Sequence, residues 1–258
     1  MSLLNDKTAL VTGGGRGIGR AIALELAARG VRVAVAARST AELEATASLI
    51  RDAGGDARVL TADLVAPGAA TELAHDALAA LGTVDMLINN AAVVWPLGAA
   101  ATIDPERWAQ AFTVNVVAPG ALTFALLGGM VERGWGRVAN VSTGIVAAPA
   151  AMVGGNAYVA TKSALEAHTI NLAAELEGTG VTVNAFRPGA VDTAMQTWIR
   201  DQDPAVIGAA LHERFEGMHA DGDLITPETS ARSLVARLDG DDTGAIWDVA
   251  DVAADQPS

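Results

Sequence analysis

Short apolar runs alternate along the chain with longer segments of helical character. These runs are too short for helices, and they lack the strict alternation of apolar and polar residues that a half-exposed strand shows. Such runs are typical of strands that are covered on both faces in a parallel sheet. The pattern predicts seven strands, at Ala9 to Thr12, Val31 to Ala37, Arg58 to Thr61, Met86 to Asn89, Val138 to Val141, Val181 to Phe186 and Ala245 to Val249.

The longer segments carry the signals of helix starts and ends. Residues 18–29 end before Gly30, and residues 40–52 end before a glycine pair. Residues 105–132 follow Asp104 as an N-cap and begin with proline. Strands that alternate with helices in this way predict an α/β fold, a doubly wound seven-stranded parallel sheet with helices on both faces.

No repeat, low-complexity tract or linker interrupts this pattern, so we expect one domain over residues 1–258 with a short acidic tail from Asp248. One long segment, residues 194–225, lies outside the alternation. In it Asp203 and Pro204 are typical of the cap and first position of a small helix with an apolar face. A long insert beside the sheet edge where ligands bind predicts a substrate lid, with surface decoration as the alternative.

Composition and charge exclude several classes of function. The net charge of −13 opposes nucleic-acid binding, which needs clustered cations. The chain has no cysteine, which fits a reducing compartment, and its four histidines form no HExxH pair, so we expect no metal site. Residues 1–7 lack signal-peptide features, and we expect no apolar segment able to span a bilayer. These features predict a cytoplasmic protein with no membrane partner.

The first predicted strand leads through a glycine-rich turn, Thr12 to Gly19, directly into a helix. Glycines let the backbone approach a pyrophosphate closely, and the free N–H groups at a helix start favour negative charge. The glycines do not follow the strict GxGxxG spacing, and a plain turn is the alternative. The order of strand, turn and helix nevertheless predicts a dinucleotide site formed by Gly13, Arg16, Gly17, Ile18 and Gly19.

The end of the second strand indicates which dinucleotide is bound. A site for NAD places an acidic residue there to hold the ribose hydroxyls. Here the strand ends with Arg38, and Arg16 is available from the glycine turn. Two guanidinium groups suit a 2′-phosphate, which predicts NADP(H) as the cofactor. A solvated Arg38 and an Arg16 that only caps a surface loop are the alternatives.

Tyr158 and Lys162 form the clearest candidate for acid–base chemistry. Tyr158 is the only tyrosine, and Lys162 is one of two lysines in a chain with 17 lysines and arginines together. The two residues are separated by one helical turn, so a plain contact on a helix face is the alternative. Since a lysine can lower the pKa of a neighbouring phenol and relay a proton, whereas an arginine cannot relay one, the spacing predicts a catalytic pair.

These motifs occur together in an order that resembles the short-chain dehydrogenase/reductase family, of the compact single-domain, Rossmann-type architecture. The resemblance covers the chain from about Lys7 to Val249. The motifs that carry it are the Thr12 to Gly19 turn, Asp63-Leu64, Asn89-Asn90-Ala91, Asn115, Ser142, Tyr158 with Lys162, and Pro188-Gly189-Ala190-Val191-Asp192-Thr193.

The resemblance implies further roles at the cofactor site. Asp63 and Leu64 would face the adenine, and Asn89 to Ala91 would lie near the ribose. The nicotinamide would be held by Pro188, Gly189, Val191 and Thr193. Asn115 would fix a helix kink and a water that links Lys162 to solvent. Helix capping for Asp63, turn formation for Asn89 and Asn90, strand termination for Pro188 and Gly189, and a tolerated helix polar residue for Asn115 are the alternatives.

The resemblance also implies a catalytic tetrad of Asn115, Ser142, Tyr158 and Lys162. The cofactor would supply a hydride to a ketone or aldehyde, and Tyr158 would supply the proton. Ser142 would hydrogen-bond the substrate oxygen, unless it only caps a turn. A phenol must lose about 3 pKa units to work near neutrality, which needs roughly 4 kcal/mol, and one cation at about 4 Å supplies about that much. We therefore expect Lys162 to lower the pKa of Tyr158.

Some features depart from the family pattern and bear on the substrate. Ser142 and Tyr158 are unusually far apart, with residues 150–155 as an extra loop, Ala92 replaces an expected glycine, and the tail lacks the usual glycine pair. An apolar lid is expected from Met195, Trp198, Ile199, Leu211, Phe215 and Met218, facing Val94, Trp95 and Met152. The substrate itself is not identified by these residues.

The prediction is an NADP(H)-dependent carbonyl reductase, or an alcohol dehydrogenase in reverse. A non-catalytic dinucleotide sensor on the same fold is the alternative from another class. An epimerase or dehydratase would need a larger substrate domain, and an enoyl reductase spaces its tyrosine and lysine more widely. The apolar helices at residues 105–132 and 156–177 predict a homodimer or homotetramer.

Overall fold

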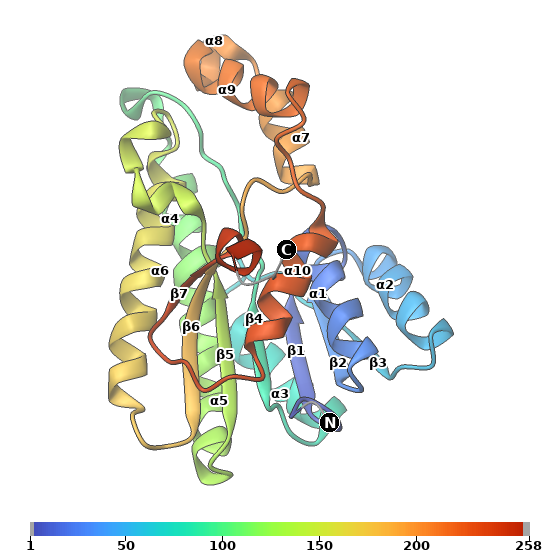
Figure 1. Ribbon diagram of the computed structural model, residues 1–258. Helices are drawn as coiled ribbons and strands as arrows, with labels where there is room; N and C mark the ends of the chain where they lie inside the picture. Colours follow the sequence, from blue (N-terminus) through green and yellow to red (C-terminus); the bar gives the residue numbers. More distant parts are fainter. Residues whose placement is uncertain (1–2, 255–258) are drawn as a thin grey trace.

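The computed structural model describes residues 3–254, so residues 1–2 and 255–258 of the expected domain lie outside the described residues. Its strands form one parallel sheet in the order β3-β2-β1-β4-β5-β6-β7 (Figure 1). They are β1 (Thr8–Thr12), β2 (Arg32–Ala37), β3 (Ala57–Thr61), β4 (Met86–Asn89), β5 (Gly136–Val141), β6 (Val181–Arg187) and β7 (Ile246–Asp248). All seven predicted strands are confirmed.

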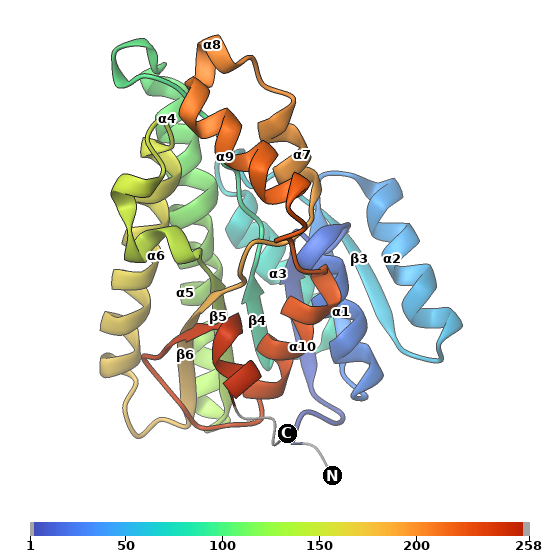
Figure 2. The same cartoon turned by 45° about the horizontal axis from the view of Figure 1, so that its top comes forward.

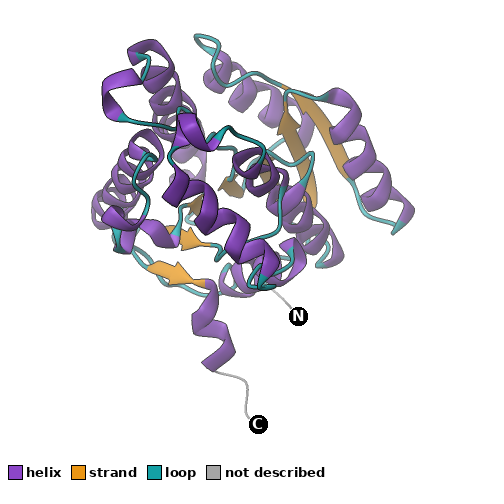
Figure 3. Ribbon diagram, turned by 90° about the horizontal axis from the view of Figure 1, so that it is seen from above, coloured by secondary structure: helices purple, strands orange, loops and turns teal. Residues whose placement is uncertain are grey.

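Helices cover both faces of this sheet, as Figure 3 shows from above. One face carries α1 (Gly17–Ala28), α2 (Thr40–Asp52) and α10 (Pro227–Arg237), and the other carries α3 (Ala69–Leu81), α5 (Ala118–Glu132) and α6 (Asn156–Glu175). In β2, Val33 and Val35 pack into the first core while Ala34 and Ala36 pack into the second. The strands therefore lack polar positions because neither face is exposed.

The strand order reverses between β1 and β4, which lie side by side at the centre of the sheet. The crossover connections leave from these two strands in opposite directions, so a crevice opens above their carboxyl ends. Doubly wound sheets bind their ligands at such a switch point. The glycine turn after β1 and the Asn89 to Ala91 segment at the end of β4 both lie at this crevice.

The segment expected to be one helix over residues 105–132 has three parts. The helix α4 (Pro105–Phe112) leads into a π-helical turn at Thr113–Val117, and α5 follows. By length and composition alone, the combined helix is long and apolar enough to cross a membrane, which corrects the expectation that no segment could. Half of its most apolar stretch is buried, and α5 packs against α3 and β5 as a core helix does.

The insert after β6 forms three helices above the carboxyl ends of the strands, α7 (Ala194–Arg200), α8 (Pro204–Ile207) and α9 (Ala209–Ala220) (Figure 2). Asp203 caps α8 as predicted, because its side chain accepts the N–H of Ala205. The single small helix that was expected here is broken at Gly208, whose φ of +96° is outside the helical range. After β7, residues 249–254 form a short 3-10 helix where a tail was expected.

Candidate active site

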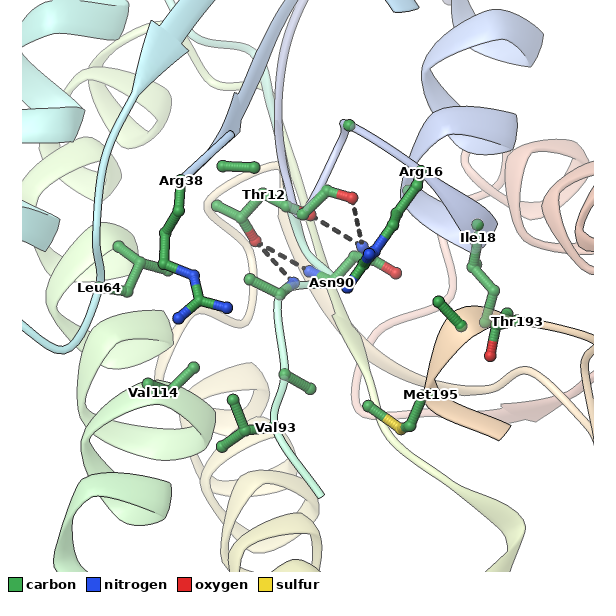
Figure 4. A pocket seen from close by; sticks show the side chains of 18 of the residues that line it. Thr12, Arg16, Ile18, Arg38, Leu64, Asn90, Val93, Val114, Thr193 and Met195 are labelled. Carbon is green, nitrogen blue, oxygen red and sulfur yellow. Dashed lines mark hydrogen bonds between the residues drawn. The ribbon is translucent and has the colours of Figure 1, made fainter. Parts of the chain in front are cut away.

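A cavity of about 1080 Å³ lies at the carboxyl ends of the strands. It runs from the glycine turn and the end of β2, past the end of β4, to the beginnings of α6 and α7 (Figure 4). The sequence-predicted residues that line it are Gly13, Arg16, Gly17, Ile18, Gly19, Arg38, Asp63, Leu64, Ala91, Ser142, Tyr158, Lys162, Pro188 and Thr193. The fold thus brings most of the predicted cofactor and catalytic residues into one chamber.

The glycine turn is fixed to the end of β4 by hydrogen bonds (Figure 4). Thr12 Oγ1 accepts the N–H groups of Asn90 and Ala91, both at 3.0 Å, and Asn90 Nδ2 donates to the Thr12 carbonyl at 2.9 Å. Gly13 has a φ of +67°, and an added Cβ would lie 2.7 Å from Asn90 Nδ2. Only glycine fits this turn, which keeps the space in front of α1 open.

Two arginines lie at the end of the cavity formed by the glycine turn and the end of β2. Figure 4 shows the guanidinium of Arg38 directed into the cavity beside Leu64. Arg38 forms no ion pair with any residue in the part of the chain that the structure describes, whereas Arg16 pairs with Glu42 at 3.3 Å. Asp63 also lines the cavity, and its Oδ1 accepts the N–H of Val65 at 3.2 Å in a turn, so it does not cap a helix as the alternative interpretation proposed.

Tyr158 and Lys162 lie on the first two turns of α6, with Lys162 Nζ 6.0 Å from the centre of the Tyr158 ring. The Lys162 ammonium donates to the carbonyl of Val141 at 2.6 Å, at the end of β5. Burial lowers the pKa of Lys162 to about 8, against an opposing contribution from the Glu166 carboxylate. Burying an ammonium favours its neutral form, so this lysine is poised to exchange a proton near neutral pH.

The expected effect of Lys162 on the phenol is wrong for this structure. Burial raises the pKa of Tyr158 to about 12, and the hydrogen bond with the Thr143 side chain acts weakly in the opposite direction. The ammonium points at Val141, so it does not offset the loss of solvent around the phenol. In this state Tyr158 is protonated and can act as an acid.

Ser142 is held by a buried carboxylate. Its hydroxyl donates to Glu166 Oε1 at 2.7 Å, and Glu166 accepts two further hydrogen bonds from Arg187, at 2.9 and 2.8 Å. Glu166 is only 4% exposed, so this pairing compensates a charge in the core. The hydroxyl beside the phenol belongs to the next residue, Thr143.

Four predicted residues support the site without lining the cavity. Asn115 is fully buried in the π turn, where Nδ2 donates to the carbonyl of Val93 at 2.8 Å and to Thr161 Oγ1 at 3.0 Å. Asn89 is buried and donates to Asn140 Oδ1 at 2.9 Å. Gly189 and Val191 lie behind the cavity wall, where Val191 pairs with Ile225 in an isolated bridge. Asn115 thus lies at the irregular turn and links it to Val93 and Thr161, while its implied roles in fixing the kink and holding a water stay predictions.

The residues present fit a nicotinamide dinucleotide. The cradle at Gly13 has no room for a side chain, a helix start faces the cavity, and an uncompensated arginine lies at the end of the cavity near β2. Donors of this kind suit a pyrophosphate and a further phosphate. Within residues 3–254, no three His, Asp or Glu side chains are grouped so that they could hold a metal ion.

Comparison with protein families decides the relationship. Residues 7–204 match the family model described as short chain dehydrogenase. The chain belongs to this family. The matched range contains the glycine turn, Asn115, the Tyr158–Lys162 pair and the Pro188 to Thr193 segment, and every residue that lines the cavity lies within it.

Relatives of this short-chain dehydrogenase have several activities. A short chain dehydrogenase of Pseudocercospora fijiensis is 37% identical over 220 residues, which are 83% of this chain and 68% of that protein. D-beta-hydroxybutyrate dehydrogenase of Cupriavidus necator is 33% identical over 258 residues, covering 96% and 97% of the two chains. Among solved structures, a variant of actinorhodin polyketide ketoreductase with NADPH has a TM-score of 0.85 at 32% identity, covering 96% and 97%.

Sequence reasoning left out two residues that shape this short-chain dehydrogenase site and misplaced the task of a third. Thr143 lies beside the phenol, Glu42 reaches the cavity from α2, and Asn90 fixes the glycine turn. Asn90 was expected near the ribose as part of its motif, or as a turn residue, and not as the residue that anchors the glycine turn. Thr143 directly follows Ser142, and nothing in the sequence shows which of these two hydroxyls faces the phenol. Glu42 lies in the next helix, so only the fold brings it to the glycine turn.

Residues 194–225, the segment predicted to be a lid, pack on an apolar cluster. Its buried members are Val94, Leu97, Met152, Ile199, Ile207, Leu211 and Phe215. Met195, Met218 and Tyr158 are partly buried against them. Trp95, Met195 and Trp198 line the cavity and contribute apolar surface at the end that lies below this segment. Most of the residues predicted for the lid and the facing wall thus pack together.

Proposed function

We propose that the chain is an NADP(H)-dependent oxidoreductase that interconverts a ketone or aldehyde and the corresponding alcohol, with Tyr158 as general acid and base. One observation carries this proposal: Tyr158 and Lys162 line the same cavity as the glycine turn and Arg38. A dinucleotide held by that turn would extend toward the acid–base pair. The substrate carbonyl would then lie between them, below the apolar lid.

Each protein group has a task in this scheme. Gly13, Gly17 and the start of α1 would hold the pyrophosphate, and Arg38 would pair with the 2′-phosphate. The bound cofactor supplies the hydride. Tyr158, protonated at neutral pH, donates its proton to the alkoxide oxygen that forms as the carbonyl is reduced. The lid excludes water from this step.

We propose carbonyl reduction as the direction of the reaction, because it needs a phenol that still carries its proton. A phenol with a pKa of about 12 holds its proton at pH 7, as a general acid must. Alcohol oxidation would require the phenolate, which burial opposes in the cofactor-free protein. The NADPH-containing ketoreductase with the same fold supports both the cofactor and the direction.

The function is tested by following NADPH oxidation with ketones, aldehydes, keto esters and sugars. We expect turnover of at least one carbonyl class, and a loss of about 10²- to 10⁴-fold in the Tyr158→Phe variant. NADPH binding to that variant, followed by fluorescence, should stay close to normal because the ring is retained. Near-normal turnover in Tyr158→Phe would contradict the catalytic role of the phenol.

A non-catalytic dinucleotide sensor is the competing function, and the presence of both Tyr158 and Lys162 at the cavity argues against it. The same assay separates the two, since a sensor would bind NADPH without turnover of any carbonyl in the panel. Cofactor choice is a separate part of the proposal. Tighter binding of NADH than of NADPH would overturn the assignment based on Arg38.

A further inference from the structure

A carboxylate lies at the end of the cavity that the proposed function assigns to the 2′-phosphate. Glu42, in the first turn of α2, lines the cavity together with Arg16, Arg38 and Ser39. It packs against the glycine turn: a Cβ added to Gly15 would lie 3.0 Å from Glu42 Cβ and 3.4 Å from Glu42 Oε2. The negative charge therefore lies close to the phosphate-binding turn.

The position of Glu42 is fixed by contacts on both sides. The Gly15 carbonyl accepts a hydrogen bond from Thr46 Oγ1 of α2 at 3.2 Å, and Arg20 Nε of α1 donates to both Gly15 and Thr46 at 3.0 Å, so these contacts tie the turn to α2. Ser39 caps α2 by accepting the N–H of Glu42 at 3.3 Å. Because the turn and the helix start are held as one unit, the carboxylate cannot leave by a shift of the helix.

The local sequence offered Glu42 a different partner. Ser39-Thr40-Ala41-Glu42 has the spacing of a capping box, in which the glutamate carboxylate returns to the backbone N–H of the cap residue. Here the carboxylate instead pairs with Arg16, with Nη1 and Oε1 at 3.3 Å. In the folded chain, the Glu42 carboxylate therefore pairs with an arginine that lines the cavity instead of capping its own helix.

Because of this ion pair, Arg16 is less available than Arg38 to bind a phosphate. The Arg16 and Glu42 side chains are 62% and 38% exposed, so their pair is individually weak and can exchange. Arg38 has no ion-pair partner among residues 3–254, and its charge is available to a ligand at once. A 2′-phosphate that recruits Arg16 must first take it from Glu42, while a ribose 2′-hydroxyl has no such need.

Building on the proposed NADP(H) dependence, we propose that Glu42 is a specificity-determining residue that limits the preference for NADPH over NADH. It does so in two ways. It holds Arg16, and its own negative charge repels the 2′-phosphate. Removing the charge should therefore strengthen binding of NADPH more than binding of NADH, which lacks the 2′-phosphate.

The test is Glu42→Gln, which keeps the size of the side chain and its contact with Gly15. The probes are 2′,5′-ADP and 5′-AMP, followed by calorimetry at low ionic strength. We expect the Kd for 2′,5′-ADP to fall by about two- to ten-fold, the range for releasing an exposed ion pair and a like charge, while the Kd for 5′-AMP, which lacks the 2′-phosphate, falls less. The gain should shrink as salt is added, because the groups are exposed.

Glu44→Gln is the matched control. Glu44 lies on the same helix and pairs with Arg51 at 3.3 Å, but it does not line the cavity. A second control repeats Glu42→Gln in an Arg16→Gln background, where most of the gain should be lost because the released arginine is absent. Thermal unfolding of each variant shows that the fold is intact.

Two results would overturn the role of Glu42: no tightening of 2′,5′-ADP in Glu42→Gln, or equal tightening in Glu44→Gln. These outcomes are distinct from failure of the proposed function. If the unmodified protein binds 5′-AMP more tightly than 2′,5′-ADP, the NADP(H) assignment fails. Even then, the contribution of Glu42 is given by the difference in the Kd for 2′,5′-ADP between the unmodified protein and Glu42→Gln.

Discussion

The hydroxyl of Ser142 donates to Glu166 Oε1 at 2.7 Å, inside the protein and in the position where a substrate-binding hydroxyl was expected. Glu166 is simultaneously paired with Arg187, so Ser142 serves as the third donor to a buried carboxylate. This network joins α6 to the ends of β5 and β6. Ser142 therefore stabilises the frame on which Tyr158 and Lys162 are placed, and Thr143 is left beside the phenol.

The assignment of Thr143 to the substrate and of Ser142 to the buried carboxylate can be tested by removing each hydroxyl in turn. Thr143→Val, which removes only the hydroxyl, should lower kcat/KM by about 10²- to 10³-fold, the cost of losing a donor to the developing oxyanion. Ser142→Ala should mainly lower the free energy of unfolding, by about 1 kcal/mol for one buried hydrogen bond. Steady-state kinetics and denaturant unfolding measure both effects. Loss of turnover in Ser142→Ala alone would restore the expected role of Ser142.

The lowered pKa of Lys162 predicts a pH dependence of cofactor binding. Below its pKa of about 8 the buried ammonium is charged and attracts an anionic dinucleotide, and above it the charge is lost. NADPH affinity should therefore fall as the pH rises through about 8. In Lys162→Arg this fall should disappear, because the guanidinium keeps its proton.

The turnover rate of Lys162→Arg distinguishes two contributions of Lys162, its positive charge and its part in a proton relay. We expect Lys162→Arg to lose about as much single-turnover rate as Tyr158→Phe, and to bind NADPH more weakly than the unmodified protein. An active Lys162→Arg variant would show that the lysine contributes only charge.

Assembly into a dimer or tetramer is predicted from the exposed apolar side chains of the π turn, α5 and α6. Val117 is 59% exposed, Phe124 63% and Ile170 47%. Burying such a patch against a symmetry mate is favourable, so we expect light scattering to give at least a dimer at micromolar concentration. Phe124→Asp should shift the protein toward the monomer. Val153→Asp, at a 79% exposed position outside these segments, should not, and a monomeric unmodified protein would contradict the prediction.

Carrier-protein substrates should be disfavoured by the charge of the lid. The exposed carboxylates of this segment are Asp201, Asp203, Glu213, Glu216, Asp221 and Asp223. None of them forms an ion pair with a lysine or arginine within residues 3–254. They should repel an acidic carrier protein more than a small neutral ketone. Competition kinetics with a ketoacyl thioester, free and carrier-bound, measures this. Faster turnover of the carrier-bound form than of a neutral ketone would show the prediction to be wrong.

Features that depend on neighbours in the chain could be predicted from the sequence. The strands are short apolar runs, and the glycine turn needs residues that reach a φ near +67°, as Gly13 does. Tyr158 and Lys162 share a helix face because they are four residues apart. Their common cavity with the glycine turn follows from a parallel sheet, which gathers the carboxyl ends of its strands at one edge.

Tertiary structure alone decided the features that depend on burial and on contacts distant in the chain. The pKa of Tyr158 rises because the folded chain removes part of the water around the phenol, a cost that no local motif reveals. Ser142 turns toward Glu166, and Glu42 toward Arg16, because charges in a folded chain pair with the partner that packing brings within reach. Spacing along the sequence places residues on an element, but the energy of a charge or hydroxyl depends on what surrounds it in space.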